Sequence, residues 1–336
     1  MRGLVFEGIG QINLRDIPDP RVEDPHDVVV AVEATGICGT DLRLVSDPPL
    51  LKGTPGSVLG HEIVGHVIDA GSNAGIAVGT RVVLEPNVVC HSCAACFDGR
   101  FNLCSNLRHL GTHIPGGFAD KVALPGSCCI PIREDMSLER AVLTEGLACV
   151  LNATRRADLH PGRSAVIFGA GPIGRLFLAV IKAAGMTDIV VTEISPERAR
   201  QARERGAIAT FDPADGPIPE QIATVLPDGA DLVVDTVGML FHDALEVVRK
   251  GGRILEFGLA DEAVLPVRPV LIAKKEVTIQ GSYLTHGYFH PAVRLLSNPA
   301  FDVDGMLGKV FTLDRVMDGF EVALQRGADI KIAITP

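Results

Sequence analysis

Short runs of β-branched residues dominate the hydrophobic pattern of the first 150 positions. The runs Val28–Val32, Val64–Ile68 and Arg81–Leu84 are each bounded by Gly, Pro, Asp or Asn, the residues that favour turns. Few stretches here show the three-to-four-residue spacing of an amphipathic helix. We therefore predict a β-rich, barrel-like lobe for this part of the chain.

From about Pro161 the pattern changes to apolar runs that alternate with helix-like segments. We predict strands at Ser164–Phe168 and Asp188–Thr192, and after each strand a helix, at Pro172–Ala184 and Pro196–Arg205. Such alternation is typical of parallel strands joined by helices that cross over the sheet. We therefore predict a second region of the α/β class.

Three further apolar runs extend this parallel sheet. They are Leu232–Asp235, Arg253–Phe257 and Val277–Gln280. Together with the earlier strands they predict a doubly wound sheet of roughly six strands. The Pro-rich stretch Asp212–Pro219 is predicted as a surface loop.

The composition fits a globular protein of two domains and argues against several other classes. At 336 residues, 47% of them apolar, the chain can fill two cores of ordinary size. A net charge of −10 and a pI near 5.5, with no run of Lys or Arg, argue against nucleic-acid and anionic-membrane partners. No apolar signal-peptide core begins the chain, and Arg175 and Lys182 interrupt its most apolar later segment. We predict no membrane helix and a cytoplasmic location.

Four cysteines lie close together in the first region, with the spacing C-x2-C-x2-C-x7-C. They are Cys90, Cys93, Cys96 and Cys104. Four thiolates at such spacing suit the closed tetrahedral coordination of a structural zinc ion. The alternative is two local disulfides, which the short separations and the lack of a secretory signal disfavour.

A glycine-rich turn follows the predicted strand Ser164–Phe168. The residues that form it are Gly169, Ala170, Gly171, Pro172, Ile173 and Gly174. They match the pattern G-x-G-x-x-G, in which the glycines allow a tight turn, backbone approach to a pyrophosphate, and close helix packing. The amino terminus of the following helix attracts the phosphates. The turn therefore predicts a dinucleotide site.

Glu193 stands 19 positions after Gly174, at the end of the next predicted strand. An acidic side chain there accepts hydrogen bonds from a ribose 2′-hydroxyl and repels a 2′-phosphate, which favours NAD over NADP. Arg198 leaves NADP open as the less favoured cofactor, because a nearby cation can accommodate a 2′-phosphate. A solvated arginine on a helix surface is the alternative interpretation.

A second candidate metal site combines Cys38 with the adjacent pair His61 and Glu62. Thiolate, imidazole and carboxylate together suit a zinc ion that keeps an open position for water or a substrate oxygen. Taken singly, such residues are more often ordinary packing or surface side chains. The prediction therefore depends on finding the three together.

Over essentially its whole length the chain resembles the medium-chain, zinc-dependent alcohol and polyol dehydrogenases, including the sorbitol and threonine dehydrogenases. Besides the four-cysteine lobe, the motifs that carry this resemblance are, in order, G-I-C-G-T-D, G-H-E-I-V-G, T-E-G-L-A-C, G-A-G-P-I-G, V-V-D-T-V-G and G-G-R-I-L-E-F-G. The resemblance implies a GroES-like catalytic domain over residues 1–150 and 284–336. It also implies a Rossmann NAD-binding domain over residues 151–283, with cofactor and substrate in the cleft between the domains.

The resemblance further implies which residues bind metal and move protons. Cys38, His61 and Glu62 would bind the catalytic zinc, and Glu145 would be a further acidic ligand, direct or through water. Thr40 would accept the proton of the alcohol and pass it toward the cofactor ribose or solvent. Asp41 would bond the imidazole of His61 and fix its tautomer, unless it is a solvated turn residue.

Residues beside the dinucleotide also follow from the resemblance. In addition to the glycine-rich turn and Glu193, they are Ile173, Arg198, Phe257, Leu259, Ser282 and Tyr283. The remaining histidines receive no role. Those near the metal motifs in sequence, His66, His91, His109 and His113, are interpreted as neighbours in sequence only.

Two positions depart from the family's pattern. Arg43 stands where many relatives carry the histidine that ends the proton relay, so the proton would leave through water. Alternatively, Arg43 binds an anionic group of the substrate or is a solvated surface residue. Gly146 stands where close relatives have proline, which loosens the loop that positions Glu145.

The predicted function is the oxidation of a secondary alcohol, polyol or sugar-like, to a ketone with NAD. One catalytic and one structural zinc ion per chain are expected. A threonine-type 3-hydroxy amino acid is the second substrate class and a short simple alcohol the third. A non-catalytic dinucleotide-binding relative is the alternative from another class, and the presence of Cys38 and His61 argues against it. We expect a homodimer or homotetramer.

Overall fold

The structure is a computed structural model that describes residues 1–8, 10–46, 53–260, 264, 266–325 and 331–336. It divides into two compact units. The first unit comprises Met1–Ala148, Thr285–Pro299 and Asp304–Pro336, and the second comprises Cys149–Leu284 and Ala300–Val303. The boundaries inferred from the sequence, at residues 150 and 284, lie next to these. They did not anticipate that Ala300–Val303 groups with the second unit.

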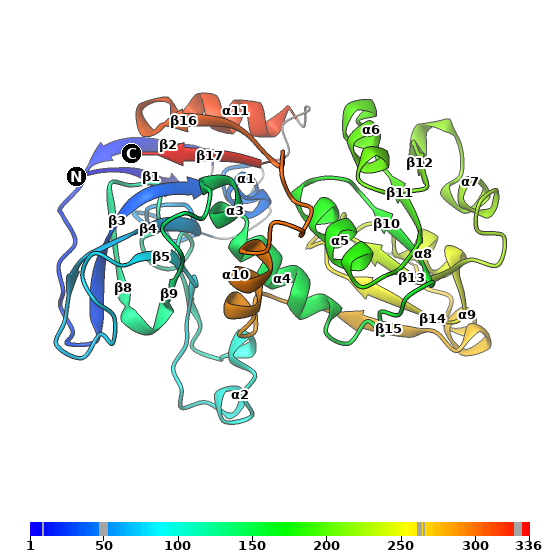
Figure 1. Ribbon diagram of the computed structural model, residues 1–336, viewed down its shortest axis with the longest axis horizontal. Coiled ribbons are helices and arrows are strands. Elements are labelled where there is room, and N and C mark those ends of the chain that lie inside the picture. The colour runs from blue at the N-terminus through cyan, green and yellow to red at the C-terminus, as the bar shows by residue number, and fades with distance from the viewer. Residues whose placement is uncertain (9, 47–52, 261–263, 265, 326–330) are drawn as a thin grey trace. The chain divides into compact units, whose positions relative to one another are not determined.

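A mixed sheet forms the centre of the first unit (Figure 1). Its strands follow the order β16-β17-β3-β4-β5-β9, and β8 also pairs with β3. Their bounds are β3 (Asp27–Gly36), β4 (Glu62–Ala70), β5 (Arg81–Leu84), β8 (Lys121–Pro125), β9 (Cys129–Pro131), β16 (Leu307–Thr312) and β17 (Lys331–Thr335). The predicted strands at Val28–Val32, Val64–Ile68 and Arg81–Leu84 fall within β3, β4 and β5 and are confirmed.

Two smaller sheets and several helices complete the first unit. The paired strands are β1 (Arg2–Gly8) with β2 (Gln11–Asp16), and β6 (Asn87–Val88) with β7 (Arg108–His109). The helices are α1 (Gly39–Leu44), α2 (Ala94–Phe97), α3 (Leu138–Val142), α10 (Phe289–Leu296) and α11 (Val316–Leu324), with 3-10 turns η1 (Phe101–Leu103), η2 (Gly126–Cys128) and η4 (Leu313–Arg315). Helix α4 (Thr144–Thr154) begins in the first unit and ends in the second.

The second unit is a parallel sheet with strand order β12-β11-β10-β13-β14-β15. The strands are β10 (Ser164–Phe168), β11 (Asp188–Thr192), β12 (Ala209–Phe211), β13 (Ala230–Asp235), β14 (Val248–Glu256) and β15 (Thr278–Gly281). This is the order of a doubly wound dinucleotide-binding sheet, so the predicted α/β class is confirmed. Every residue of β10 is buried, as expected for a strand covered on both faces.

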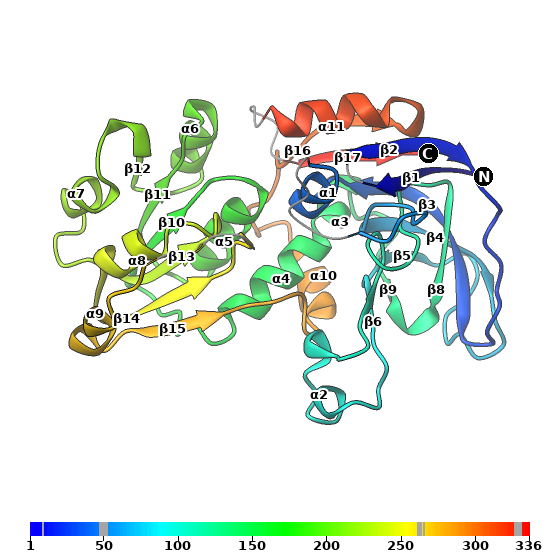
Figure 2. The same ribbon diagram turned by 180° about the vertical axis from the view of Figure 1, so that it is seen from behind.

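Helices cover both faces of this parallel sheet. In Figures 1 and 2, α5 lies on one side and α8 on the other. The helices are α5 (Pro172–Ala183), α6 (Pro196–Glu204), α7 (Ile218–Ala223), α8 (Phe241–Val247) and α9 (Pro269–Lys275), with the 3-10 turn η3 (Pro213–Asp215). Among the described residues, no helix is both long enough and apolar enough to cross a membrane.

The segment Asp212–Pro219, predicted as a loop, contains η3 and the start of α7, so that prediction was wrong. Pro213 and Pro219 stand in the first turns of these elements, where proline lacks only an N–H that would be unpaired in any case. The side chain of Asp212 caps η3 by accepting a hydrogen bond from the Ala214 N–H. Here proline begins helical structure.

Candidate metal and cofactor sites

The first unit brings Cys38, His61 and Glu62 together. Cys38 is the N-cap residue of α1, two positions after β3 ends, while His61 directly precedes β4 and Glu62 begins it. Antiparallel pairing of β3 with β4 sets Gly36 opposite Glu62. As a result, the three potential ligand atoms all lie within 4.8 Å of one another.

Two glycines provide the space for this grouping. Gly60 has a φ of +91°, and a Cβ atom there would lie 2.8 Å from the Thr35 Cγ2 atom. A Cβ atom on Gly36 would lie 2.1 Å from Oε2 of Glu62. Both positions therefore require glycine if His61 and Glu62 are to keep their places.

Asp41 is fully buried beside the site. Its Oδ2 atom accepts a hydrogen bond of 2.8 Å from the backbone N–H of Cys38. Its Oδ1 atom lies 3.7 Å from Nδ1 of His61, too far for a hydrogen bond, and both of these buried atoms lack a partner among the described residues. The bond expected between the two side chains is not formed in this geometry.

The other predicted residues near Cys38 occupy the same helix, α1. The hydroxyl oxygen of Thr40 lies 3.7 Å from the sulfur of Cys38, next to the candidate ligands. Arg43 is half-buried, and its carbonyl oxygen accepts a hydrogen bond from the Ser46 hydroxyl. Glu145, the second residue of α4, is buried, but it is not among the grouped ligand atoms of the described chain. Its ligation stays a prediction.

Lys331 is a member of the site that the sequence analysis missed. Its Nζ atom donates to both carboxylate oxygens of Glu62, at 2.7 Å each, and to the carbonyl oxygen of Ile37 at 3.2 Å. Lys331 is 5% exposed and Glu62 3%. A lysine that directly precedes the apolar residues 332–334 of β17 was the available signal, since a buried ammonium group requires a partner.

His109 is the second residue that was missed. It ends β7, it is buried, and its ring centroid lies 5.1 Å from that of His61 in an edge-to-face arrangement. Burial and the neighbouring His61 lower the pKa of His109 to about 3. The interpretation of His109 as a neighbour in sequence only was therefore wrong.

The charges around this site fit a cation. Burial lowers the pKa of His61, but Cys38 and Asp41 raise it more, so that the net pKa lies well above the usual value. The pKa of Lys331 is also raised, because Glu62, Cys38 and Glu145 outweigh its burial. With its thiolate, imidazole and carboxylate donors and its orphaned buried polar atoms, the site matches the ligand preferences of zinc.

The four-cysteine lobe lies between β6 and β7. Its potential ligand atoms, from Cys90, Cys93, Cys96 and Cys104, also lie within 4.8 Å of one another, and none of the cysteines forms a disulfide. Hydrogen bonds from Ser92 lower the pKa of Cys90 to about 5, which favours the metal-binding thiolate. The grouping fits a closed tetrahedral zinc site.

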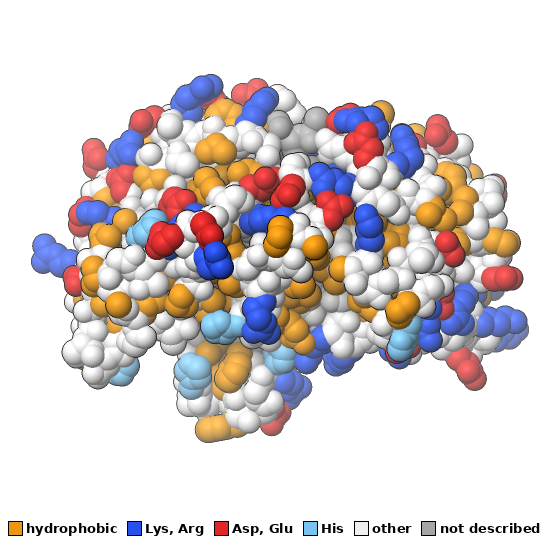
Figure 3. All heavy atoms as spheres, viewed as in Figure 1, with side chains coloured by type: hydrophobic (Ala, Val, Ile, Leu, Met, Phe, Trp, Pro, Cys, Tyr) orange, Lys and Arg blue, Asp and Glu red, His pale blue; other side chains and the backbone are white. Residues whose placement is uncertain are grey.

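Large apolar side chains of this lobe face solvent. Phe97 is 79% exposed, and Phe101 and Leu103 are also exposed. Figure 3 shows hydrophobic surface over the segment that carries α2. The lobe therefore lacks an apolar core of its own and needs its metal to hold it together.

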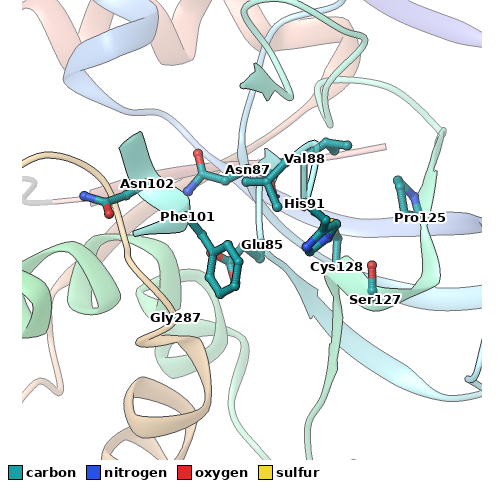
Figure 4. Close-up of a pocket in the computed structure, with 11 residues that line it drawn as sticks. Glu85, Asn87, Val88, His91, Phe101, Asn102, Pro125, Ser127, Cys128 and Gly287 are labelled. Atoms are coloured by element: carbon teal, nitrogen blue, oxygen red, sulfur yellow. Dashed lines mark hydrogen bonds between the residues drawn. The ribbon is translucent and has the colours of Figure 1, made fainter. Parts of the chain in front are cut away.

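A pocket of about 270 Å³ opens in the first unit beside this lobe (Figure 4). Glu85 and Asn87 line it, and both bond the Thr285 hydroxyl, at 2.7 and 2.9 Å. Burial raises the pKa of Glu85. The described lining does not include Cys38 or His61. The polar groups of the pocket thus fasten the segment that follows Leu284 to the strands of the first unit.

The predicted dinucleotide turn occupies its expected place between β10 and α5. Gly169 has a φ of +93°, and a Cβ atom on Gly174 would lie 1.9 Å from the Gly169 carbonyl oxygen. Gly171 is the N-cap residue of α5, followed by Pro172 and Ile173 in its first turn. The nearest atom to a Cβ built on Gly171 is Nη1 of Arg198, at 3.8 Å.

Glu193 is buried after β11, and both of its carboxylate oxygens accept backbone hydrogen bonds. Oε2 accepts from the Ala170 N–H at 2.7 Å, and Oε1 accepts from the Ser195 N–H at 2.9 Å. The carboxylate thus connects the glycine-rich turn to the turn that begins α6.

Later segments supply the other predicted cofactor neighbours. The ring of Phe257 packs edge-to-face on Phe177 of α5, with centroids 5.2 Å apart. Leu259 and Tyr283 are exposed. The hydroxyl oxygen of Ser282 lies 3.4 Å from Nδ2 of Asn152. Contact of these residues with a dinucleotide stays a prediction.

Glu256 ends β14 opposite Asp235 of β13, and it yields a pH-dependent prediction. Burial and Asp235 raise its pKa to about 7, and its buried Oε1 atom lacks a partner among the described residues. The folded protein thus holds this proton above the ordinary pKa of 4.5, and stability is lost as pH rises through the interval from 4.5 to about 7.

We predict that Glu256→Gln raises the melting temperature at pH 8 by roughly 2–4 °C, because the amide removes the ionised carboxyl. The gain should shrink toward pH 5, where wild-type Glu256 is largely protonated when folded. Thermal unfolding at both pH values is the measurement. An equal gain at the two pH values would contradict the assigned cause.

Two family models match this chain. Residues 24–134 match the alcohol dehydrogenase GroES-like domain, and residues 172–298 match the zinc-binding dehydrogenase domain. The D-xylulose reductase A of Aspergillus niger is 31% identical over 351 residues, which cover 98% of this chain and 95% of that protein.

Solved structures show the same architecture over the whole chain. A Sinorhizobium meliloti 1021 protein crystallised with NADP has a TM-score of 0.92 and 31% identity, covering 100% of this chain and 99% of the other. The 2R,3R-butanediol dehydrogenase of Bacillus subtilis has a TM-score of 0.90 and 28% identity, with the same coverage.

A GroES-like unit with a cysteine–histidine–glutamate grouping, in one chain with a doubly wound dinucleotide-binding unit, defines a zinc-binding dehydrogenase. The chain belongs to the medium-chain, zinc-dependent alcohol and polyol dehydrogenase family. It is an oxidoreductase that acts on the CH–OH group of its substrate, and the predicted enzyme class is confirmed.

Proposed function

We propose that this enzyme oxidises a secondary alcohol of the polyol or sugar class to the ketone, with NAD as hydride acceptor. The observation that carries the proposal is the grouping of Cys38, His61 and Glu62 within 4.8 Å in the unit that matches the GroES-like family. The names of two relatives, a D-xylulose reductase and a butanediol dehydrogenase, support a substrate with several hydroxyl groups.

In this proposal Cys38, His61 and Glu62 hold the catalytic zinc, with Glu145 as a further acidic ligand. Zinc bound there would supply a Lewis acid that lowers the pKa of a substrate hydroxyl. Thr40, whose hydroxyl lies beside Cys38, accepts the proton that the alcohol loses while it passes its own proton toward the cofactor ribose or solvent. Asp41 lies close enough to His61 to bond Nδ1 after a small movement and so orient the ring.

The four cysteines have a structural role in this proposal, and the two units divide the work. Residues 1–150 and 284–336 act as the catalytic domain, and residues 151–283 bind the dinucleotide. We further propose a homodimer or homotetramer in the cytoplasm, with a small-molecule alcohol as its ligand and no nucleic-acid or membrane partner.

A cofactor preference for NAD follows from Glu193, with Arg198 nearby as the group that would tolerate NADP. We predict that Glu193→Ala lowers kcat/KM for NAD by about 10- to 100-fold. This is the loss expected when charge-assisted hydrogen bonds to the ribose diol are removed. Activity with NADP should fall less, because the repelling carboxylate is removed. Steady-state kinetics with both cofactors is the measurement, and Glu193→Gln is the matched control.

Equal losses with NAD and NADP in the Glu193→Ala enzyme would assign Glu193 to the shape of the turns alone. Its carboxylate accepts hydrogen bonds from the backbone N–H groups of Ala170 and Ser195, so its loss would disturb both turns and weaken both cofactors alike. The glutamine variant keeps the size of the side chain and removes its charge, so it separates charge from loop geometry.

A 3-hydroxy amino acid such as threonine is the second candidate substrate. Arg43 favours it, since Cys38 is the N-cap residue of the helix that carries Arg43, and a guanidinium binds a carboxylate group well. The deciding experiment measures NADH formation by the zinc-loaded enzyme with polyols, sugars, threonine and simple alcohols, with and without a chelator. Chelator-sensitive turnover of polyols supports the proposal, and turnover of threonine alone would replace it.

A further inference from the structure

The four-cysteine lobe is connected to the rest of the first unit by a pair of short strands. β6 leads into the lobe and β7 leads out of it, and the two strands pair with Asn87 opposite His109 and Val88 opposite Arg108. The position of His109 is therefore tied to the closure of the lobe that precedes it in the chain.

His109 in turn contacts the candidate catalytic site. Its ring lies 5.1 Å from the ring of His61 at an interplanar angle of 60°. Both rings are buried, with 7% of His109 and 3% of His61 exposed. Edge-to-face packing of this kind fixes the relative orientation of two rings.

A tight turn holds His109 on its other side. The carbonyl oxygen of His109 accepts backbone hydrogen bonds from Thr112, His113 and Ile114, and its own N–H donates to Nδ1 of His113 at 3.1 Å. The hydroxyl of Thr112 lies 3.3 Å from Nδ1 of His109. The imidazole of His109 is thus anchored through its backbone and through its side chain.

Packing matters for His61 because its Nδ1 atom forms no hydrogen bond within the described chain that would fix the ring. Its Nδ1 atom lies 3.7 Å from Oδ1 of Asp41 and has no partner among the described atoms. A ligating imidazole is ordinarily oriented by a bond from its second nitrogen. Because this bond is not formed, the contact with the ring of His109 limits the rotation of the His61 ring.

We propose that His109 is a positioning residue for His61 and that it couples closure of the four-cysteine lobe to metal binding at the Cys38, His61 and Glu62 site. The inference rests on the proposed function, in which His61 is a zinc ligand. The zinc of the four-cysteine lobe then has a second effect besides stabilising the lobe. It keeps β7 in place, and His109 of β7 keeps His61, the ligand of the catalytic zinc, in place.

Metal affinity tests this inference without any turnover. In His109→Ala, the affinity of the catalytic site for Zn²⁺, measured by competition with a chromogenic chelator, should fall by about 10- to 100-fold, as when a group that orients a metal ligand is lost. The visible spectrum of Co²⁺ bound at that site should shift. His109→Phe keeps a flat ring against His61, and its affinity should stay within about threefold of wild type.

Two further variants test the coupling and control for general effects. Cys96→Ser, which opens the lobe, should also weaken Zn²⁺ binding at the catalytic site by about tenfold or more, the expected cost of losing the orienting contact. His66→Ala removes a half-buried histidine of β4 that is not one of the grouped ligands and should leave the affinity unchanged.

Unchanged affinity in His109→Ala, or an equal loss in His109→Phe, would overturn the positioning role. Unchanged affinity in Cys96→Ser would overturn the coupling. If His109→Ala does not fold, the Zn²⁺ affinities of His109→Phe and Cys96→Ser still test the positioning role and the coupling. Failure of the proposed function is recognised separately, because Cys38→Ser would then leave both zinc ions bound.

Discussion

Replacing Cys38 with serine is expected to abolish turnover and to remove one of the two zinc ions while the fold stays intact. The thiolate is one of three grouped ligand atoms, and serine at neutral pH is a poor ligand for zinc. Loss of Lewis-acid stabilisation worth several kcal/mol corresponds to a fall in kcat of about 10³-fold or more. Kinetics, metal analysis and thermal unfolding together make the measurement.

Cys129→Ser is the matched control for this variant. Cys129 is a buried cysteine of β9 outside both groups of metal ligands, so its replacement should keep two zinc ions and most of the activity. Full activity in Cys38→Ser, or retention of both zinc ions, would remove Cys38 from the catalytic site.

Lys331→Met is expected to lower the free energy of unfolding by about 3–5 kcal/mol in the metal-free enzyme. The ammonium group makes two bonds of 2.7 Å to a carboxylate that is 3% exposed, and without it Glu62 is left as a buried, unpaired charge. Bound zinc would supply a second positive charge near Glu62. The loss should therefore be smaller in the zinc-loaded enzyme, and urea unfolding with and without a chelator measures both values.

The double variant Lys331→Met with Glu62→Gln separates the pair from its surroundings. Because neither partner then leaves a buried charge, the double variant should regain at least half of the stability that Lys331→Met loses. If metal-free Lys331→Met loses less than about 1 kcal/mol of unfolding free energy, the Lys331–Glu62 pair contributes no more than a surface ion pair, and the prediction is wrong. Lys121→Met, which removes a partly exposed lysine on β8, is the control.

Local patterns in the sequence were enough to predict the elements that position the cofactor. The alternation from Ser164 onward predicted a parallel sheet, because strand and helix periods are properties of short segments. The spacing of Cys90 to Cys104 and the pair His61 and Glu62 likewise predicted the grouped metal ligands. In each case residues close together in the sequence, or a known motif, were sufficient for the prediction.

Lys331 and His109 were missed because long-range contacts decide their roles. Lys331 is separated from Glu62 by 269 positions, and the pairing of β17 with β3 and of β3 with β4 brings the two together. His109 packs on His61 from the end of β7, a contact that no motif marks. Asp212–Pro219 failed for a different reason, since proline was interpreted as a helix breaker where it begins η3 and α7.

The solvent-facing apolar side chains of the four-cysteine lobe bear on how this enzyme is made. A newly synthesised chain that lacks zinc has four unpaired thiols and the exposed side chains of Phe97, Phe101 and Leu103 on one open segment. Such a segment invites association between chains and oxidation to mixed disulfides. Growth medium rich in zinc should therefore raise the yield of monodisperse protein, and this effect should not depend on catalytic activity.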